Sequence, residues 1–171
     1  MNRNPVVRLA HWPSFFLQLL IILAVFLAIH ILLPVASVDQ KLMLAAFAYI
    51  AFCRLMRALF IKDYTKAVKA YHQSRFEDAA RYFAASHEFF VKHPNIDRWR
   101  WLIFGVTSPY SYRVLCLGNQ AVCYTQLGQA KKAIALYEEA LREEPNYRLA
   151  KFSLDGLRAV LREAGGQSAT A

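Results

Sequence analysis

A stretch of twenty residues without a formal charge, Ser14 to Leu33, most constrains what this chain can fold into. Gln18 and His30 are its only strongly polar members. Twenty helical residues are about 30 Å long, which matches the hydrocarbon core of a membrane. We therefore expect a transmembrane helix here. A cleaved signal peptide is the alternative, but its apolar region spans only about 7–15 residues, and here a second apolar segment follows.

The second apolar segment, Leu42 to Ile61, carries Arg54 and Arg57 in its last third. It crosses a membrane if both arginines extend to the headgroup layer. Otherwise it is an interfacial or buried helix that lies on the first one. Ser37 or Asp39 could cap its start. Because neither Pro nor Gly occurs between Pro34 and Pro94, we expect this helix to continue unbroken to about Ser74.

The basic excess of the chain is densest beside these apolar segments. Residues 1–62 carry six basic residues and one acidic residue, a net charge of +5, and residues 63–171 carry +4. This distribution favours anionic lipid headgroups over nucleic acid as a partner. The positive-inside rule then places both ends of a hairpin, with spans at about 14–33 and 42–61, in the cytoplasm. The expected membrane-interface residues are Trp12, Arg54, Arg57, Lys62, Trp99 and Trp101.

Residues 114–147 carry the pattern of two amphipathic helices joined by a tight turn. Their glycine can take the left-handed conformation that often ends a helix, and their proline ends the second helix. An ordinary helical hairpin is one interpretation. The segment also resembles a tetratricopeptide repeat (TPR), a helical hairpin of 34 residues, although Gln120 departs from the usual pattern. The residues that carry the resemblance are Leu117, Ala121, Tyr124, Gly128, Ala133, Tyr137, Ala140 and Pro145.

Together these patterns predict an all-α fold in which an N-terminal transmembrane helical hairpin, residues 1–62, precedes a short TPR-like α-solenoid, residues 63–163. We expect a degenerate repeat at 63–93, with Ser74 in place of the turn glycine, an insertion at 94–113 and the clear repeat at 114–147. A capping helix at 148–163 should turn Leu149, Phe152, Leu157 and Val160 toward the repeat, and residues 164–171 should form a disordered tail. The aromatic insertion could meet lipid, bind a partner or pack across the repeats.

No catalytic residues, metal ligands or phosphate-binding loop stand out, so we expect neither an enzyme nor a cofactor or small-molecule substrate. A haem would need axial ligands on facing helices, and the second apolar segment has no histidine to pair with His30. Cys116 and Cys123 are too far apart on one helix for a disulfide, so reduced thiols are expected.

The TPR resemblance implies binding rather than chemistry, since in that family the first helices of successive repeats line a concave groove. The groove residues it implies are Leu115, Gly118, Val122, Thr125, Gln126, Lys151 and Ser153. Gly118 and Val122 stand where chaperone-binding members hold a carboxylate, so that specificity is not expected.

One hypothesis is a scaffold in a bacterial inner membrane that binds protein subunits of a membrane complex at the cytoplasmic face. The order of hairpin and repeat is similar to the TPR component of Pel-type exopolysaccharide secretion systems, a likeness of architecture alone. The alternative is a non-catalytic accessory subunit of a respiratory or transport enzyme, acting mainly through its membrane helices.

Overall fold

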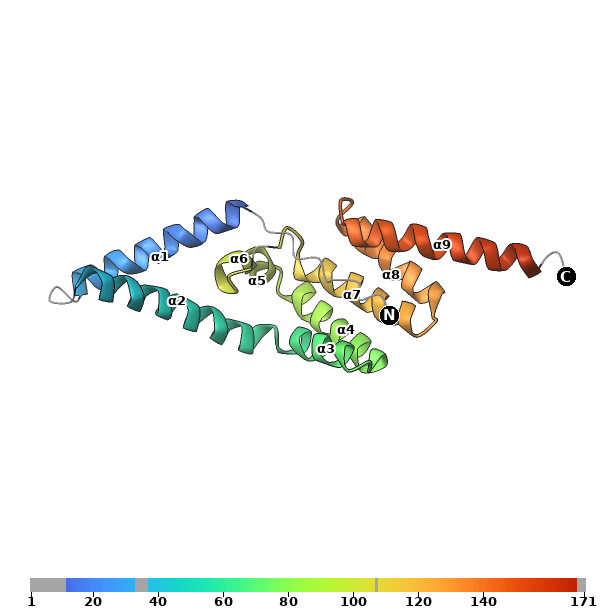
Figure 1. The fold of residues 1–171 in the computed structure, drawn as a ribbon, viewed down its shortest axis with the longest axis horizontal. Coiled ribbons are helices and arrows are strands. Elements are labelled where there is room, and N and C mark those ends of the chain that lie inside the picture. Colours follow the sequence, from blue (N-terminus) through green and yellow to red (C-terminus); the bar gives the residue numbers. More distant parts are fainter. Residues whose placement is uncertain (1–11, 33–36, 107, 169–171) are drawn as a thin grey trace. The chain divides into compact units, whose positions relative to one another are not determined.

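The computed structural model describes residues 12–32, 37–106 and 108–168. All regular secondary structure in this part of the chain is helical, which confirms the all-α part of the expected fold (Figure 1). The chain divides into two compact units, which are considered separately below. The first contains residues 1–62 with 95–109, and the second contains residues 63–94 with 110–171.

The first unit consists of α1 (Trp12–Leu32), α2 (Val38–Phe60) and a segment that holds most of α5 (Pro94–Arg98) and all of α6 (Arg100–Ile103). The helices α1 and α2 pack against each other, and both contact α6. Among the described residues, α2 is the one helix long and apolar enough to cross a membrane, with a mean hydropathy of 1.7. The apolar stretch Leu19–Ile31 of α1 is shorter than a span requires. By length and composition, one of the two expected spans, α2, is therefore long and apolar enough to cross.

The start of α2 is closed by a capping box. The Ser37 hydroxyl accepts a hydrogen bond from the Gln40 backbone N–H at 3.4 Å, and the Gln40 side chain accepts one from the Ser37 N–H at 3.2 Å. These bonds satisfy two backbone donors that the first turn of a helix leaves free. Ser37 is therefore the cap, rather than Asp39, and α2 begins at Val38, before the expected Leu42.

The helix does not continue unbroken to Ser74, so that expectation was wrong. It ends at Phe60, and α3 (Lys62–His72) begins after a single residue. Ile61 donates its N–H to the Arg57 carbonyl at 3.0 Å but has φ −112° and ψ 23°. Its β-branched side chain is buried, and such packing can outweigh local helix propensity even where no Pro or Gly is present.

The second unit consists of two helical hairpins and a final helix (Figure 1). The first hairpin is α3 with α4 (Phe76–Lys92), and the second is α7 (Tyr112–Gln126) with α8 (Ala130–Glu143). The final helix is α9 (Arg148–Ser168), which extends past the expected end at residue 163. Helix α4 packs against α7, α7 against α8, and α8 against α9, as neighbouring elements of a solenoid do.

Alanine residues form much of the core of the second unit. One buried cluster joins α3, α4 and α7 through Ala67, Ala70, Ala79, Ala80, Phe83 and Cys123. A second cluster joins α7, α8 and α9, and it includes Leu117, Ala121, Ala133, Tyr137 and Ala140, all from the TPR pattern. Tyr124 packs against both clusters. The small side chains let the helices approach closely, as the sequence pattern predicted.

The turns of the two hairpins have the same geometry at a constant offset of 54 residues. Ser74 has φ +60° and Gly128 has φ +71°. The Arg75 N–H donates to the Ala70 carbonyl at 3.0 Å, and the Gln129 N–H donates to the Tyr124 carbonyl at 2.9 Å. Residues 63–93 therefore form a helical hairpin with the turn of the clear repeat, with Ser74 in the position of the turn glycine.

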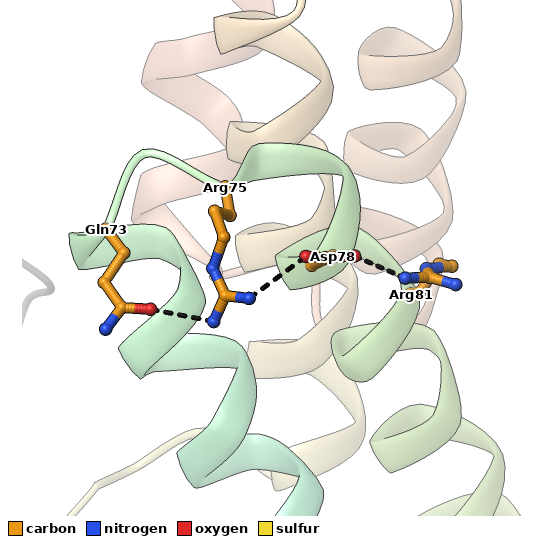
Figure 2. A network of polar contacts seen from close by, with 4 residues as sticks. All are labelled: Gln73, Arg75, Asp78 and Arg81. Carbon is orange, nitrogen blue, oxygen red and sulfur yellow. Dashed lines mark hydrogen bonds and ion pairs between the residues drawn. The ribbon is translucent and has the colours of Figure 1, made fainter.

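A network of polar side chains extends from Gln73 and Arg75, on either side of Ser74 in the sequence, to Asp78 and Arg81 on α4 (Figure 2). Asp78 lies between two arginines: it pairs with Arg75 at 3.4 Å, and it also pairs with Arg81. Arg75 donates a further hydrogen bond to the Gln73 side chain at 2.7 Å. The side chains of both arginines are more than half exposed. Exposed pairs of this kind contribute little, so the turn depends mainly on its backbone hydrogen bonds.

The left-handed turn predicts opposite effects at its two equivalent positions. Ser74→Gly should raise the unfolding free energy by about 0.5–1 kcal/mol, because glycine removes the steric cost of positive φ. Gly128→Ala should lower it by about 1 kcal/mol for the same reason. Thermal unfolding of the full chain in detergent, followed by circular dichroism, measures both shifts. Equal midpoints for the two variants would show that the turn conformation carries no such cost.

Candidate functional site

The expected groove residues lie on two helices of the second unit. Leu115, Gly118, Val122, Thr125 and Gln126 are on α7, and Lys151 and Ser153 are on α9. Only Gln126 and Lys151 among them are exposed. Leu115 and Val122 are half-buried against the second core cluster, and Gly118 is buried. Most of these side chains therefore take part in packing.

Tyr147 covers the position of Gly118. A Cβ atom added to Gly118 would lie 2.3 Å from the Tyr147 hydroxyl oxygen and 2.6 Å from its ring. The ring is buried and contacts Tyr110 edge-to-face at 4.9 Å, and the Tyr110 hydroxyl donates to the Asn146 carbonyl at 3.1 Å. Burial raises the pKa of Tyr147, so its hydroxyl keeps its proton. The surface expected to be open at Gly118 is thus occupied by the chain's own tyrosine.

A second tyrosine connects three helices. Thr125 on α7 and Ser153 on α9 both hydrogen-bond to the side chain of Tyr137 on α8. Burial raises the pKa of Tyr137, and the two hydrogen bonds oppose this only in part. The Thr125 hydroxyl also donates to the Ala121 carbonyl at 3.0 Å. Thr125 and Ser153 therefore form hydrogen bonds within the core of the unit. These bonds leave their hydroxyl groups less able to bind a partner than their expected groove positions suggest.

The three cysteines are free and buried. Burial raises the pKa of the Cys123 thiol to about 12. At neutral pH this thiol is almost entirely protonated, and the protonated form is a poor nucleophile. Cys123 is therefore a core residue.

In the first unit, three side chains in a row on α2 donate hydrogen bonds to backbone carbonyl groups of residues 95–109, here called the aromatic segment. The Arg57 Nε donates to the Phe104 carbonyl at 2.7 Å, and its Nη2 donates to the Gly105 carbonyl at 3.5 Å. One and two turns earlier, Cys53 and Tyr49 reach the Leu102 carbonyl at 4.0 and 3.5 Å. The spacing of four residues puts all three donors on one face of α2.

Arg100 joins the beginning and the end of the same segment through hydrogen bonds. Its guanidinium donates to the Asp97 carbonyl at 3.0 Å and to the Pro109 carbonyl at 3.0 Å, so it joins the two sides of the segment. Phe104 is fully buried, and the centre of its ring lies 6.5 Å from that of Phe60. The insertion therefore packs against the apolar helices α1 and α2. The last residues of the insertion, from Tyr110 on, belong to the second unit, where Tyr112 stacks on Phe90 at 4.9 Å.

The expected membrane-interface residues have different environments. Arg54 and Lys62 are exposed, and Arg57 binds the carbonyl groups described above. Trp99 is 48% exposed, and Trp101 is half-buried at 5.7 Å from it. Trp12 is the first residue of α1, but its side chain lies outside the described residues.

Within the described residues, no three His, Cys, Asp or Glu side chains are placed to hold a metal ion. His30 lies near the end of α1, and its Nδ1 is 3.2 Å from the Lys41 Nζ. The Lys41 side chain is buried beside this histidine.

Sequence reasoning missed three features of these sites: the cover that Tyr147 gives Gly118, the donor row on α2, and the closure by Arg100. The spacing of Tyr49, Cys53 and Arg57 was a signal for the second, but nothing in it named the acceptor. The acceptors are backbone carbonyl groups about fifty residues later in the chain.

The contact between Tyr147 and Gly118 predicts that Gly118→Ala destabilises the protein, although alanine favours helices over glycine by about 1 kcal/mol. The added methyl group forces the tyrosine ring out of its site, at a cost of about 1–3 kcal/mol. A double-mutant cycle with Tyr147→Ala, measured by thermal unfolding, should show coupling, because the alanine at 118 costs little once the ring is gone. Additive effects would contradict the contact.

The donor row predicts that Arg57→Met loosens the segment 102–106. Hydrogen bonds from a charged donor contribute about 1.5–3 kcal/mol, so amide hydrogen exchange of this segment should accelerate about 10- to 100-fold. Mass spectrometry of the exchanged protein in detergent measures it. Arg54→Met is the matched control, since Arg54 is exposed and none of the hydrogen bonds to this segment described above comes from it. Equal exchange in the two variants would contradict the role of Arg57.

Comparison with known proteins gives one match. Residues 114–147 match the family model of the tetratricopeptide repeat. No curated protein and no solved structure matches the chain. The matched range covers α7, the Gly128 turn and α8, and the residues of the repeat pattern lie in their shared core. A repeat of this kind indicates a scaffold for protein–protein interaction. Residues 114–147 of this chain are therefore similar to a tetratricopeptide repeat.

Proposed function

We propose that this protein is a membrane-anchored scaffold whose TPR unit binds protein partners at the cytoplasmic face of a bacterial inner membrane. The observation that carries the proposal is α2. It is apolar over a length that suits a bilayer, and only 11% of its most apolar window is buried by the rest of the chain. An apolar helix with so little protein cover needs lipid or a partner around it.

The aromatic segment supports a membrane setting for the first unit. In a bilayer an unpaired backbone carbonyl costs several kcal/mol, so irregular backbone is tolerated there only where protein donors satisfy it. Arg57, Tyr49 and Cys53 supply such donors to residues 102–105. Trp99 is exposed beside them, and tryptophan is favoured at headgroup depth.

The charge distribution supports the orientation. Arg54, Arg57, Lys62, Lys66 and Lys69 follow one another at and after the end of α2. At its other end, Lys41 is only 3% exposed, and its Nζ lies 3.2 Å from the His30 Nδ1. The exposed positive charge is therefore concentrated at the C-terminal end of α2, the end that the positive-inside rule assigns to the cytoplasm.

The second unit supports the scaffold role. A solenoid usually needs about three repeats for a continuous core, and this chain offers two hairpins and one further helix. A complex with other subunits would supply the missing cover. The resemblance to a component of exopolysaccharide secretion systems rests on the order of hairpin and repeat, and it names one pathway in which such a scaffold would act.

Single cysteines at two exposed positions test the orientation. Val38→Cys lies at the start of α2 and Lys131→Cys lies on α8. A membrane-impermeant maleimide should label Val38→Cys in cells with an intact inner membrane, and it should label Lys131→Cys only after that membrane is permeabilised. The native thiols are buried, so the unmodified protein is the background control.

Labelling of both positions in intact cells would place the TPR unit outside the cytoplasm. Protection of both positions would show that α2 does not cross. In either case the proposed location fails. Detergent extracts of the same cells test the scaffold role, because a membrane protein should co-purify in a fixed ratio. Recovery of the protein alone would count against that role.

A further inference from the structure

The outer face of α9 is not the polar cap expected from the sequence. Leu149 and Leu157 pack on the core as expected, together with Ala150 and Leu154. Phe152, in contrast, is 71% exposed and Val160 is 61% exposed, which corrects their expected direction. The buried residues follow a stripe at positions 150, 154 and 157, and Phe152 lies on the opposite side of the helix.

A row of exposed residues follows this outer face: Arg148, Phe152, Gly156, Ala159 and Glu163. Their spacing of 4, 4, 3 and 4 keeps them on one side of a helix and is the spacing that two paired helices use. Gly156 lies at the middle of the row, and a Cβ atom added there would meet nothing within 4 Å. Solenoids need a polar face at each end for solubility, so an exposed phenylalanine here calls for cover.

The row is complementary to itself when it is reversed. Arg148 and Glu163 are equally far from the point between Asp155 and Gly156, and so are Phe152 and Ala159. An antiparallel second α9 would therefore place Glu163 of each copy beside Arg148 of the other, and Ala159 beside Phe152. In a parallel pair the like charges would meet instead.

We propose that α9 pairs antiparallel with the α9 of a second copy of this chain, so that the protein is a twofold-symmetric dimer. A twofold interface uses the same patch on both subunits, and this requires a patch that complements itself. Phe152 is the apolar anchor, the Arg148 and Glu163 pairs set the direction, and Gly156 allows the helices to approach closely. The proposal concerns the second unit alone, and it holds whether or not α2 crosses a membrane.

Neighbouring charges are compatible with this pairing. Asp155 lies at the edge of the face, with Lys151 one turn before it and Arg158 nearly one turn after it. These two cations reduce the electrostatic repulsion between the Asp155 carboxylates of the two copies. Arg158 pairs within the chain with Glu138 at 2.6 Å. No such ion pair involves Arg148 or Glu163 among the residues that the structure describes.

Disulfide cross-linking of the full chain in native membranes tests the geometry. The double variant Arg148→Cys/Glu163→Cys should form a covalent dimer with a mild oxidant, because the thiol at position 148 of one copy would lie beside the thiol at position 163 of the other. Arg148→Cys alone should not, since its two copies would lie about 22 Å apart along the helix axis. The unmodified protein controls for the native thiols. Efficient cross-linking of Arg148→Cys to itself would overturn the antiparallel pair.

The mass of the purified protein in detergent, corrected for bound detergent, tests the energetics. The native chain should be a dimer and Phe152→Glu a monomer, whereas Lys131→Glu on α8 should remain dimeric. Arg148→Glu should raise the dissociation constant about tenfold, and the exchange Arg148→Glu/Glu163→Arg should restore it. Circular dichroism confirms that each variant is folded. A native monomer, alone or bound to a different protein, would overturn the proposal, and so would a dimer unaffected by Phe152→Glu.

Discussion

Close helix packing through small residues is the constraint on which the second unit depends. Ala67, Ala70, Ala79, Ala121, Ala133 and Ala140 are all fully buried between helices. A core of this kind buries little apolar area per residue, so it depends on how closely the backbones approach. The few large side chains then have defined places. Tyr147 occupies the space left by Gly118, and Tyr137 hydrogen-bonds to residues from both neighbouring helices.

In the first unit the main constraint is different: backbone carbonyl groups next to apolar helices need hydrogen-bond donors. The segment 95–109 contains two short helices, and short helices leave many carbonyl groups without partners in the backbone. Arg100 satisfies carbonyls within the segment, and Arg57 with its two neighbours on α2 satisfies those of residues 102–105. Arg57 therefore binds backbone here, and this contact gives a reason for one of the two arginines that interrupt the otherwise apolar α2.

How much the sequence could predict depended on whether the cause was local. The helical hairpin of 114–147 and its turn at Gly128 follow from neighbouring residues, and the structure confirms them. Neighbouring residues also left two candidates for the cap of α2, Ser37 and Asp39, and the structure shows that it is Ser37. The break at Ile61, the direction of Phe152 and the cover over Gly118 depend on residues distant in the chain or on the exact rotation of a helix. Spacing alone left these undetermined, since a shift of one residue turns a helical side chain by about 100°.

The two hairpins show how sequence and geometry can separate. Their turns share hydrogen bonds at a constant offset of 54 residues, yet the family match covers only the second hairpin. At the turn, Ser74 adopts positive φ at a steric cost, whereas Gly128 adopts it at none. The first hairpin also lacks an aromatic residue at the position of Tyr124, because Ala70 stands there. Tyr64 fills part of that deficit, since it packs on both Phe83 and Tyr112 and accepts a hydrogen bond from Asn119 at 3.1 Å. Aromatic contacts thus add to the alanine-rich cluster that joins the first hairpin to the second. A short solenoid built this way is stabilised at the junction of its hairpins, and its terminal helix α9 is the element with the most apolar surface still to cover.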